Sequence, residues 1–367
     1  MHRSVIRTTM NRHSIAVGAL VGLALTLAAC GSSSPAQSAS ASASSLASSS
    51  AAAEAVASSA ASPGSAAPSA SAAAAGNGQL GMIFEVNNKG WQKLLNTPDK
   101  KGMVVVLVLP NQPGAKAGIA EGDLITKMNG VDTTNANIAN LQIRKLKVGD
   151  KVSLDLERKS GPAKVDVTVD PAQQLDLPAV LDDRVNKAPN DARFLFLRAA
   201  YGKKDAKSMM DDYNKAIQTA PDFVSAYVER GTAEQTANQD AALQDFNKAA
   251  SLDPNYEPLY VNRSVLYSAR KEYDKALADD QKAVQLDPSD PAAYANLGIG
   301  LVNSGDPTKA LAAENDALQR DPQFGPALLY RGLLMRDAAK ADLQNASRLV
   351  RDPQLKSVAD NALQKMS

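Results

Sequence analysis

The chain has 367 residues and is close to electrical neutrality, with 40 Lys and Arg against 39 Asp and Glu. This balance argues against a nucleic-acid-binding protein, because such proteins concentrate positive charge on one face. One cysteine, Cys30, and two histidines, His2 and His13, are present. This small number of cysteines and histidines excludes a disulfide framework and a Cys/His zinc site. We therefore expect no metal and no cofactor.

The N-terminus has the pattern of an export signal. Residues 1–14 hold three arginines and no acid, and the apolar stretch Ile15–Ala29 is too short for a typical membrane span and ends in small residues. Residues 27–30 read LAAC, which resembles the lipobox of bacterial lipoproteins. The resemblance implies that residues 1–29 are removed and that Cys30 carries diacylglycerol. An ordinary signal peptide that contains a cysteine is the alternative.

Cleavage before Cys30 would remove both histidines and leave 37 basic against 39 acidic residues, a net charge of about −2. Ser-His-Asp and Cys-His catalytic arrangements would then be excluded. Carboxylates or a serine–lysine pair remain chemically possible. However, the adjacent acids at 182–183, 211–212 and 279–280 lie in predicted helices, where neighbours point about 100° apart. We therefore predict a protein without enzymatic activity.

Residues 30–78 form a low-complexity segment of mostly Ser and Ala. Such a segment cannot bury enough apolar surface to offset the loss of chain entropy on folding. It is predicted to be a disordered tether.

Strand patterns begin at Gln79. The run MVVVLVL at 103–109 predicts a buried strand, and the strand at 123–128 leads into the turn pair Asn129-Gly130. Residues 135–146 predict a short helix. Alternating segments at 151–158 and 163–169 predict a hairpin.

The segments 113–125 (PGAKAGIAEGDLI), 128–131 (MNGV) and 148–152 (VGDKV) resemble the signature of bacterial PDZ domains, and the resemblance covers residues 79–172. It implies a small β-barrel or sandwich with short helices. In that family a peptide C-terminus adds as an extra strand, and a loop holds its carboxylate. Matched position by position, the groove residues are Gln79, Leu80, Gly81 and Met82 in the loop, Met82, Ile83 and Phe84 in the strand at 82–86, and Ile138 and Leu141 in the helix.

One departure from the family pattern is that the tether runs directly into Gln79, with no obvious strand before the loop. The segment 163–169 is then the candidate closing strand. The alternative to peptide binding is a PDZ fold used only for packing, with its groove blocked or unused.

The chain from residue 177 to 367 repeats itself. Prolines 221, 254, 288, 322 and 353 are separated by 33, 34, 34 and 31 residues, a period that is typical of tetratricopeptide repeats. The resemblance implies an all-α solenoid. Its predicted units are 190–223, 224–257, 258–290, 291–324, an incomplete unit at 325–353 and a capping helix at 354–366.

Charged residues recur in register in these units. Arginine recurs in the first helix at 198, 230 and 263, and aspartate recurs in the second helix at 212, 245 and 279. In the next unit both members change, to Leu297 and Ala313. Losing one partner of a buried pair is costly and losing both is not, so we predict three ion pairs inside the repeats.

By family geometry, the concave face of the solenoid takes residues from the first helix of each unit. The predicted peptide-binding residues are Val228, Thr232, Val261, Asn262, Val265, Ala295, Asn296 and Ile299. Solenoid helices also pack on one another, so each of these residues could equally belong to the core.

These features predict a multidomain α+β protein in the cell envelope, lipid-anchored on the extracytoplasmic side of the membrane. Its predicted function is that of a scaffold for proteins or peptide C-termini, without nucleic-acid partners. A regulatory or substrate-delivery subunit of an envelope protease or cell-wall enzyme is the alternative. The short join at 171–178 predicts limited but real freedom between the two folded parts.

Overall fold

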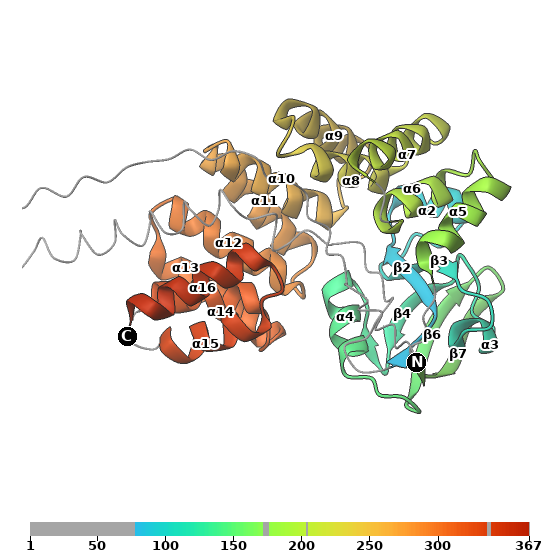
Figure 1. Cartoon of the computed structure of the whole chain (residues 1–367), viewed down its shortest axis with the longest axis horizontal. Coiled ribbons are helices and arrows are strands. Elements are labelled where there is room, and N and C mark those ends of the chain that lie inside the picture. Colours follow the sequence, from blue (N-terminus) through green and yellow to red (C-terminus); the bar gives the residue numbers. More distant parts are fainter. Residues whose placement is uncertain (1–77, 172–175, 203–204, 336–338, 367) are drawn as a thin grey trace, which may run out of the picture.

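The computed structural model describes residues 78–171, 176–202, 205–335 and 339–366. Two parts are evident in Figure 1: a sheet module, residues 78–171, and a helical solenoid, residues 177–365. The predicted signal, the tether up to residue 77 and Cys30 lie outside the described residues.

The sheet module is built from antiparallel strands in the order β2-β3-β4-β6-β7, with β5 paired to β4. A separate short pair joins β1 to β8. The strands are β1 (Gly78–Gln79), β2 (Met82–Val86), β3 (Met103–Val108), β4 (Leu124–Met128), β5 (Val131–Asp132), β6 (Lys151–Arg158), β7 (Gly161–Thr168) and β8 (Asp170–Pro171).

The predicted strands at 103–109 and 123–128 and the hairpin at 151–169 are confirmed. Asn129 and Gly130 have φ values of 53° and 79°, the left-handed conformation that a two-residue hairpin turn requires. The expectation about the closing strand was wrong. Residues 161–168 pair with β6, and a short strand does precede the loop, because Gln79 pairs with Asp170.

Three helices complete the sheet module: α2 (Lys89–Leu95), α3 (Pro113–Lys116) and α4 (Ala136–Arg144). The predicted helix at 135–146 corresponds to α4, which starts where the side chain of Asn135 accepts a hydrogen bond from the Ile138 amide. The sequence reading did not predict α2. Asn88 caps it by accepting from the Gly90 and Trp91 amides.

Strands β2 and β3 are buried on both faces, which explains the uninterrupted apolar run of β3. Leu80, Met82 and Phe84 point into the core of the sheet module, together with Met103 and Val105. Ile83, Val104 and Val106 point the other way, into a second core that includes solenoid residues.

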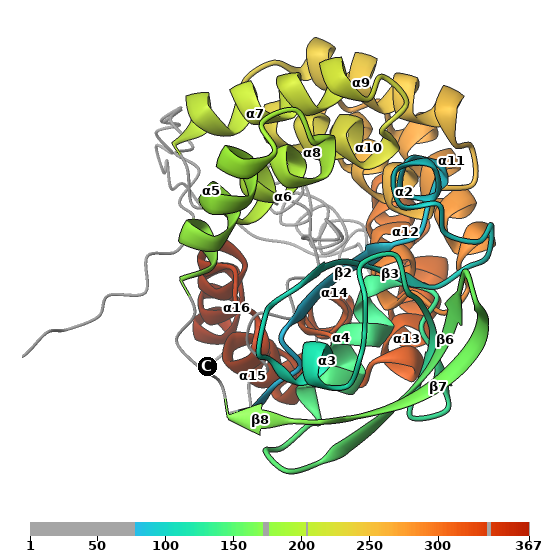
Figure 2. The same cartoon turned by 90° about the vertical axis from the view of Figure 1, so that its right-hand side faces the viewer.

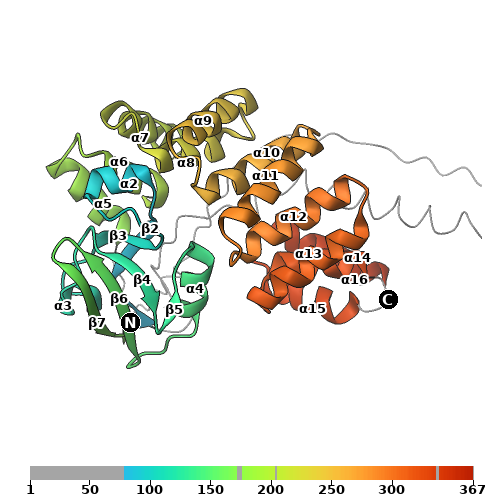
Figure 3. The ribbon, with the colours of Figure 1, turned by 180° about the vertical axis from the view of Figure 1, so that it is seen from behind.

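The solenoid consists of α5, then the successive helix pairs α6/α7, α8/α9, α10/α11, α12/α13 and α14/α15, then α16. The helices are α5 (Leu177–Lys187), α6 (Ala192–Tyr201), α7 (Ala206–Thr219), α8 (Val224–Glu234), α9 (Gln239–Leu252), α10 (Glu257–Ala269), α11 (Tyr273–Leu286), α12 (Pro291–Asn303), α13 (Pro307–Arg320), α14 (Gly325–Leu334), α15 (Ala339–Leu349) and α16 (Pro353–Lys365). Figure 3 shows the pairs α10/α11, α12/α13 and α14/α15 stacked in sequence. The unit predicted as incomplete, 325–353, contains both of its helices, α14 and α15.

The predicted ion pairs are present. Arg198 binds Asp212, Arg230 binds Asp245 and Arg263 binds Asp279, each through two hydrogen bonds of 2.6–2.9 Å. A fourth pair, Arg331 with Asp342, occupies the last unit at 2.7 and 2.8 Å. The sequence reading missed this pair, although Arg331 follows Leu297 by one repeat.

Three of these four arginines also join consecutive repeats. Arg230 donates to Asn214, Arg263 to Asn247 and Arg331 to Asn315, each partner lying in the second helix of the preceding unit. The charge pattern therefore stabilises both the interior of each repeat and the contact between repeats.

An aromatic cluster joins the two parts of the molecule. Trp91 of α2 is fully buried, with its ring centroid 5.5 Å from that of Phe196 and 4.7 Å from that of Phe223. Gly90 allows this approach, since a Cβ atom there would lie 2.8 Å from the backbone nitrogen of Val224. The expected freedom between the two parts is contradicted by this shared core, and Figure 2 shows the solenoid curving around the sheet module.

Candidate functional site

The predicted carboxylate loop and receiving strand lie at an edge of the sheet. Among the described strands, β2 pairs only with β3, so its other backbone edge has no strand partner there. The loop turns at Gly81, where φ is 70° and a Cβ atom would lie 2.0 Å from the Cβ of Gln112. This position therefore requires glycine.

The predicted groove residues are brought together only in part. Leu80, Met82 and Phe84 are buried in the sheet-module core, whereas Ile83 faces the core shared with the solenoid. Ile138 and Leu141 are half-buried on α4, and the core-facing residues of α4 are Ala136, Ala139 and Ile143. Groove contacts from Ile138 and Leu141 stay a prediction.

The groove elements are bonded directly to the solenoid through three aspartates, Asp253, Asp287 and Asp321. Each precedes one of the repeat prolines, and they lie 34 residues apart. Asp253 accepts from the Lys89 amide at the start of α2 (3.0 Å), Asp287 from Asn135 Nδ2 at the start of α4 (3.0 Å) and Asp321 from Arg144 Nη2 at the end of α4 (2.8 Å).

The two oxygens of each aspartate have different tasks. The Oδ1 atoms of Asp253, Asp287 and Asp321 each accept from the backbone amide two residues later and so hold the turn between repeats. The Oδ2 atoms reach the sheet module. The Asp-Pro punctuation was visible in the sequence, but only as a helix end; its second role depends on the fold.

Further contacts lie beside these three. Asn88 Nδ2 donates to Ser225 Oγ at 2.8 Å, and Asn137 Nδ2 donates to Asp290 Oδ1 at 2.8 Å. Asn137 belongs to the first turn of α4 and Asn88 follows β2. The solenoid therefore contacts the chain just after β2 and α4 at both of its ends.

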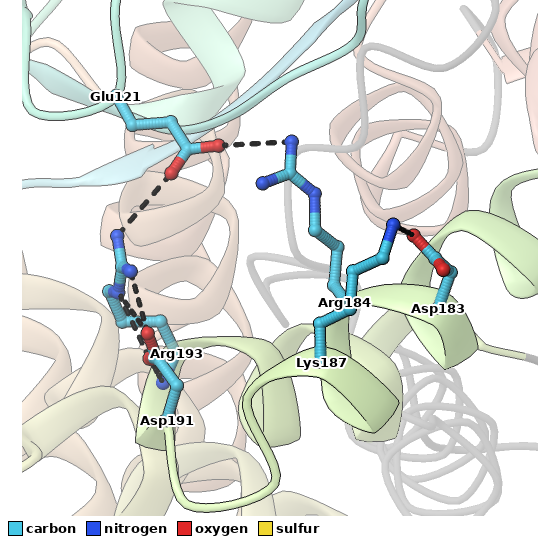
Figure 4. Close-up of polar contacts among 6 residues, drawn as sticks. All are labelled: Glu121, Asp183, Arg184, Lys187, Asp191 and Arg193. Carbon is cyan, nitrogen blue, oxygen red and sulfur yellow. Dashed lines mark hydrogen bonds and ion pairs between the residues drawn. The ribbon is translucent and has the colours of Figure 1, made fainter.

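At the opposite side of the interface, Glu121 bridges two solenoid arginines (Figure 4). Its Oε2 lies 3.4 Å from Arg193 Nη1, and its Oε1 lies 3.8 Å from Arg184 Nη2. A hollow of about 620 Å³ adjoins this contact, between the end of α2 and the turn from α5 to α6. The charged side chains in its wall, Asp191 and Arg193, bind each other.

Buried carboxyl groups gather between β2 and the inner helices of the solenoid. Burial raises the pKa of Glu85 to about 7, although the Tyr201 hydroxyl donates to it at 2.6 Å. Burial, with a smaller effect of Glu85, raises the pKa of Glu229 to about 8. These pKa values indicate a site where extra negative charge is poorly tolerated.

Most of the residues predicted for the concave face are packed between helices. Thr232 and Val265 are half-buried, and the other six are buried: Val228, Val261, Asn262, Ala295, Asn296 and Ile299. Asn262 donates to the Pro258 carbonyl at 2.9 Å, while its own Oδ1 has no hydrogen-bond partner among the described residues. A contact role for these residues stays a prediction.

Within the described ranges, no group of three His, Cys, Asp or Glu side chains is placed to hold a metal ion. The same ranges contain no helix with the length and hydropathy of a membrane span.

Comparison with known families identifies both parts. Residues 78–169 match the family model of the PDZ domain. This segment is a PDZ domain. Residues 257–290, which form α10 and α11, match the family model of the tetratricopeptide repeat, and the helical part is a solenoid of this kind of helix pair.

Curated relatives match the PDZ domain alone. The periplasmic serine endoprotease DegP of Salmonella typhimurium is 32% identical over 97 residues, which are 26% of this chain and 20% of the relative. The serine protease Do-like HtrB of Bacillus subtilis is 39% identical over 70 residues, 19% of this chain and 15% of the relative. The chain thus spans a fifth or less of these relatives, and the matched segment carries no protease domain.

Two solved structures resemble part of the chain each. The HtrA-type protease AlgW with decapeptide is 20% identical with a TM-score of 0.25, covering 27% of this chain and 30% of that one. Yeast Tom70 is 15% identical with a TM-score of 0.45, covering 53% of this chain and 43% of that one.

Proposed function

We propose that this protein is an extracytoplasmic adaptor without enzymatic activity, which binds peptide C-termini in the PDZ groove and proteins on the concave face of the solenoid. The observation that carries the proposal is the edge of β2 beside the Gly81 loop that pairs with no other described strand, since a PDZ domain binds a peptide by adding it to such an edge. Once a partner is bound by one module, the effective concentration for its contact with the other module would be raised.

Peptide binding is tested with a fluorescent decapeptide that ends in apolar residues, prepared with a free or an amidated C-terminus. The amide should bind at least about tenfold more weakly, because the loop would lose its carboxylate partner. Leu141→Glu on α4 should weaken binding of the free acid. Val148→Glu, at an exposed apolar position, is the matched control. Equal affinity of acid and amide would contradict groove binding.

The lipobox resemblance supports anchoring at Cys30, and the periplasmic location named for the DegP relatives supports an extracytoplasmic site. Cys30→Ser should move the protein from the membrane fraction to the soluble fraction while peptide affinity is unchanged. Retention of the variant in the membrane fraction would count against a lipid anchor.

A second candidate function is a regulatory or substrate-delivery subunit of an envelope protease or cell-wall enzyme. The PDZ similarity to periplasmic serine endoproteases favours it, because this chain matches their PDZ part alone. Isolation of the tagged protein from detergent-solubilised membranes should then recover a protease or hydrolase in fixed proportion, and the Leu141→Glu variant should lose it.

A further inference from the structure

Strand β7 forms one edge of the sheet. It has eight residues, Gly161–Thr168, and among the described strands it pairs only with β6, whereas β2 lies at the other end of the strand order. Figures 1 and 3 show β7 on the side of the PDZ domain that is turned away from α10–α16. A strand of this length with an unpaired edge is a template for pairing with another chain.

Pro162 shows which backbone groups of β7 point away from β6. It lies opposite Glu157 but has no N–H to donate. In an antiparallel ladder, alternate residues bond to the neighbouring strand and the residues between them point outward, so Pro162 belongs to the outward set. The register between β6 and β7 is uninterrupted. Lys164, Asp166 and Thr168 therefore also direct their N–H and C=O groups to the unpaired edge.

The outward residues of β7 are accessible. All four are exposed, whereas Ala163 and Val165 are half-buried against the core of the PDZ domain. The Nζ atom of Lys164 lies 3.7 Å from Asp155 Oδ1 of β6, and the Lys164 side chain is 71% exposed. Asp166 has no hydrogen-bond or ion-pair partner among the described residues. Both charges are therefore available to a second chain.

The charges of β7 are self-complementary. When two β7 strands pair antiparallel about a twofold axis at Val165, Lys164 of one copy lies opposite Asp166 of the other. Because both residues belong to the outward set, each such pair exchanges backbone hydrogen bonds in both directions and adds an ion pair on the exposed face. Pro162 then lies opposite Thr168, where its missing N–H affects only the end of the ladder.

Neighbouring registers are less favourable. Moving the axis by one residue, to Lys164 or to Asp166, places two like charges directly opposite each other, which is destabilising. Lysine and proline on an edge strand oppose indiscriminate strand addition. The register centred on Val165 gives the lysine an opposing acid, so the charge pattern selects this register.

We propose that this protein forms a homodimer in which the β7 strands of two copies pair antiparallel and join the two PDZ sheets into one. The contact is a strand edge and not a broad apolar face, so the dimer is weak and depends on protein concentration. Because β2 lies at the other end of the strand order, the dimer leaves both β2 edges free, and the inference does not depend on peptide binding there.

Sedimentation equilibrium of the purified protein tests the pairing. The average mass should rise with concentration from that of one chain toward that of two. Lys164→Asp and Asp166→Lys each place like charges opposite each other, and by symmetry each change acts twice in the dimer. Each variant alone should therefore raise the dissociation constant of the dimer at least about tenfold.

Mixing the two variants distinguishes this register from other modes of association. In the mixture, a strand with two acids meets a strand with two lysines, so the variants should associate with each other although neither associates with itself. The double variant, which exchanges both charges, should associate like the parent.

Lys147→Asp is the matched control, because it makes the same charge change at an exposed position outside β7 and should leave the dimer intact. Circular dichroism checks that each variant is folded. A parent protein that stays monomeric at its highest soluble concentration would overturn the inference and leave this edge to a strand of another protein. Single variants that associate as tightly as the parent, or a mixture that stays monomeric, would overturn it as well.

Discussion

The contact of Trp91 with the solenoid makes a prediction that one substitution can test. Phe223 is fully buried, with its ring centroid 4.7 Å from that of Trp91 and 5.1 Å from that of Phe196. Replacing a buried Phe by Ala costs about 3–5 kcal/mol. We expect Phe223→Ala to lie at the upper end, since two aromatic contacts are lost with the buried area.

The chain contains a single tryptophan, so its fluorescence reports on this interface alone. In the parent protein, urea unfolding followed by Trp91 emission should coincide with unfolding followed by helical circular dichroism, because the PDZ domain and the solenoid share a core. In Phe223→Ala, the emission of the native protein should shift to longer wavelength. The fluorescence transition should then move to lower urea than the main loss of helix.

Phe246→Ala provides the control. Phe246 is also fully buried, but it belongs to the cluster of α8–α10 and not to the core that contains Trp91. It should cost a similar free energy of unfolding and leave the native Trp91 emission unchanged. Coincident transitions and unchanged emission in Phe223→Ala would refute the conclusion that the interface holds the two modules together.

Three further predictions follow from the same structure. Gly90→Ala improves helix propensity by about 1 kcal/mol. However, the added Cβ would lie 2.8 Å from the backbone nitrogen of Val224, so the substitution should lower the urea midpoint of unfolding and expose Trp91. A higher midpoint would contradict this. Arg263→Leu leaves Asp279 buried without its partner and should cost about 3–5 kcal/mol in urea unfolding. Adding Asp279→Ala reproduces the Leu297 and Ala313 combination of the next repeat and should recover most of that loss; an equally unstable double variant would contradict the pairing. Burial raises the pKa of Asp280 to about 8, so its protonated form favours the folded state, and Asp280 should lower stability by about 1.4 kcal/mol per pH unit as pH rises toward 8. Glu85 and Glu229 act in the same direction, so Asp280→Asn should reduce the slope of urea unfolding between pH 6 and 8 by this amount, and an unchanged slope would contradict the shift.

Local patterns in the sequence were sufficient where neighbouring residues decide the structure. The run at 103–109, the Asn129-Gly130 turn and the 34-residue period each depend on short-range geometry, and each predicted the correct element. The paired change from Arg and Asp to Leu297 and Ala313 gave long-range information, because both members of a buried pair must change together.

The predicted site residues stay a prediction, because their exposure depends on how the two modules are joined. Six of the eight residues predicted for the concave face are buried. Trp91 and the helix that carries it were not predicted, since a single aromatic residue in a short segment has no periodicity. The signal that could have identified Trp91 is its position directly after a glycine, Gly90, and three residues after the capping Asn88.

The sequence by itself determined that a PDZ-like module precedes a helical repeat array, and which charges pair inside the repeats. Only the tertiary structure decided that these are not two independent modules joined by a flexible linker. Asp253, Asp287 and Asp321 each hold a turn with one oxygen and the PDZ domain with the other. The physical reason is that a period in the sequence fixes the spacing of equivalent side chains along the solenoid, whereas the surface that meets them is folded from a distant part of the chain.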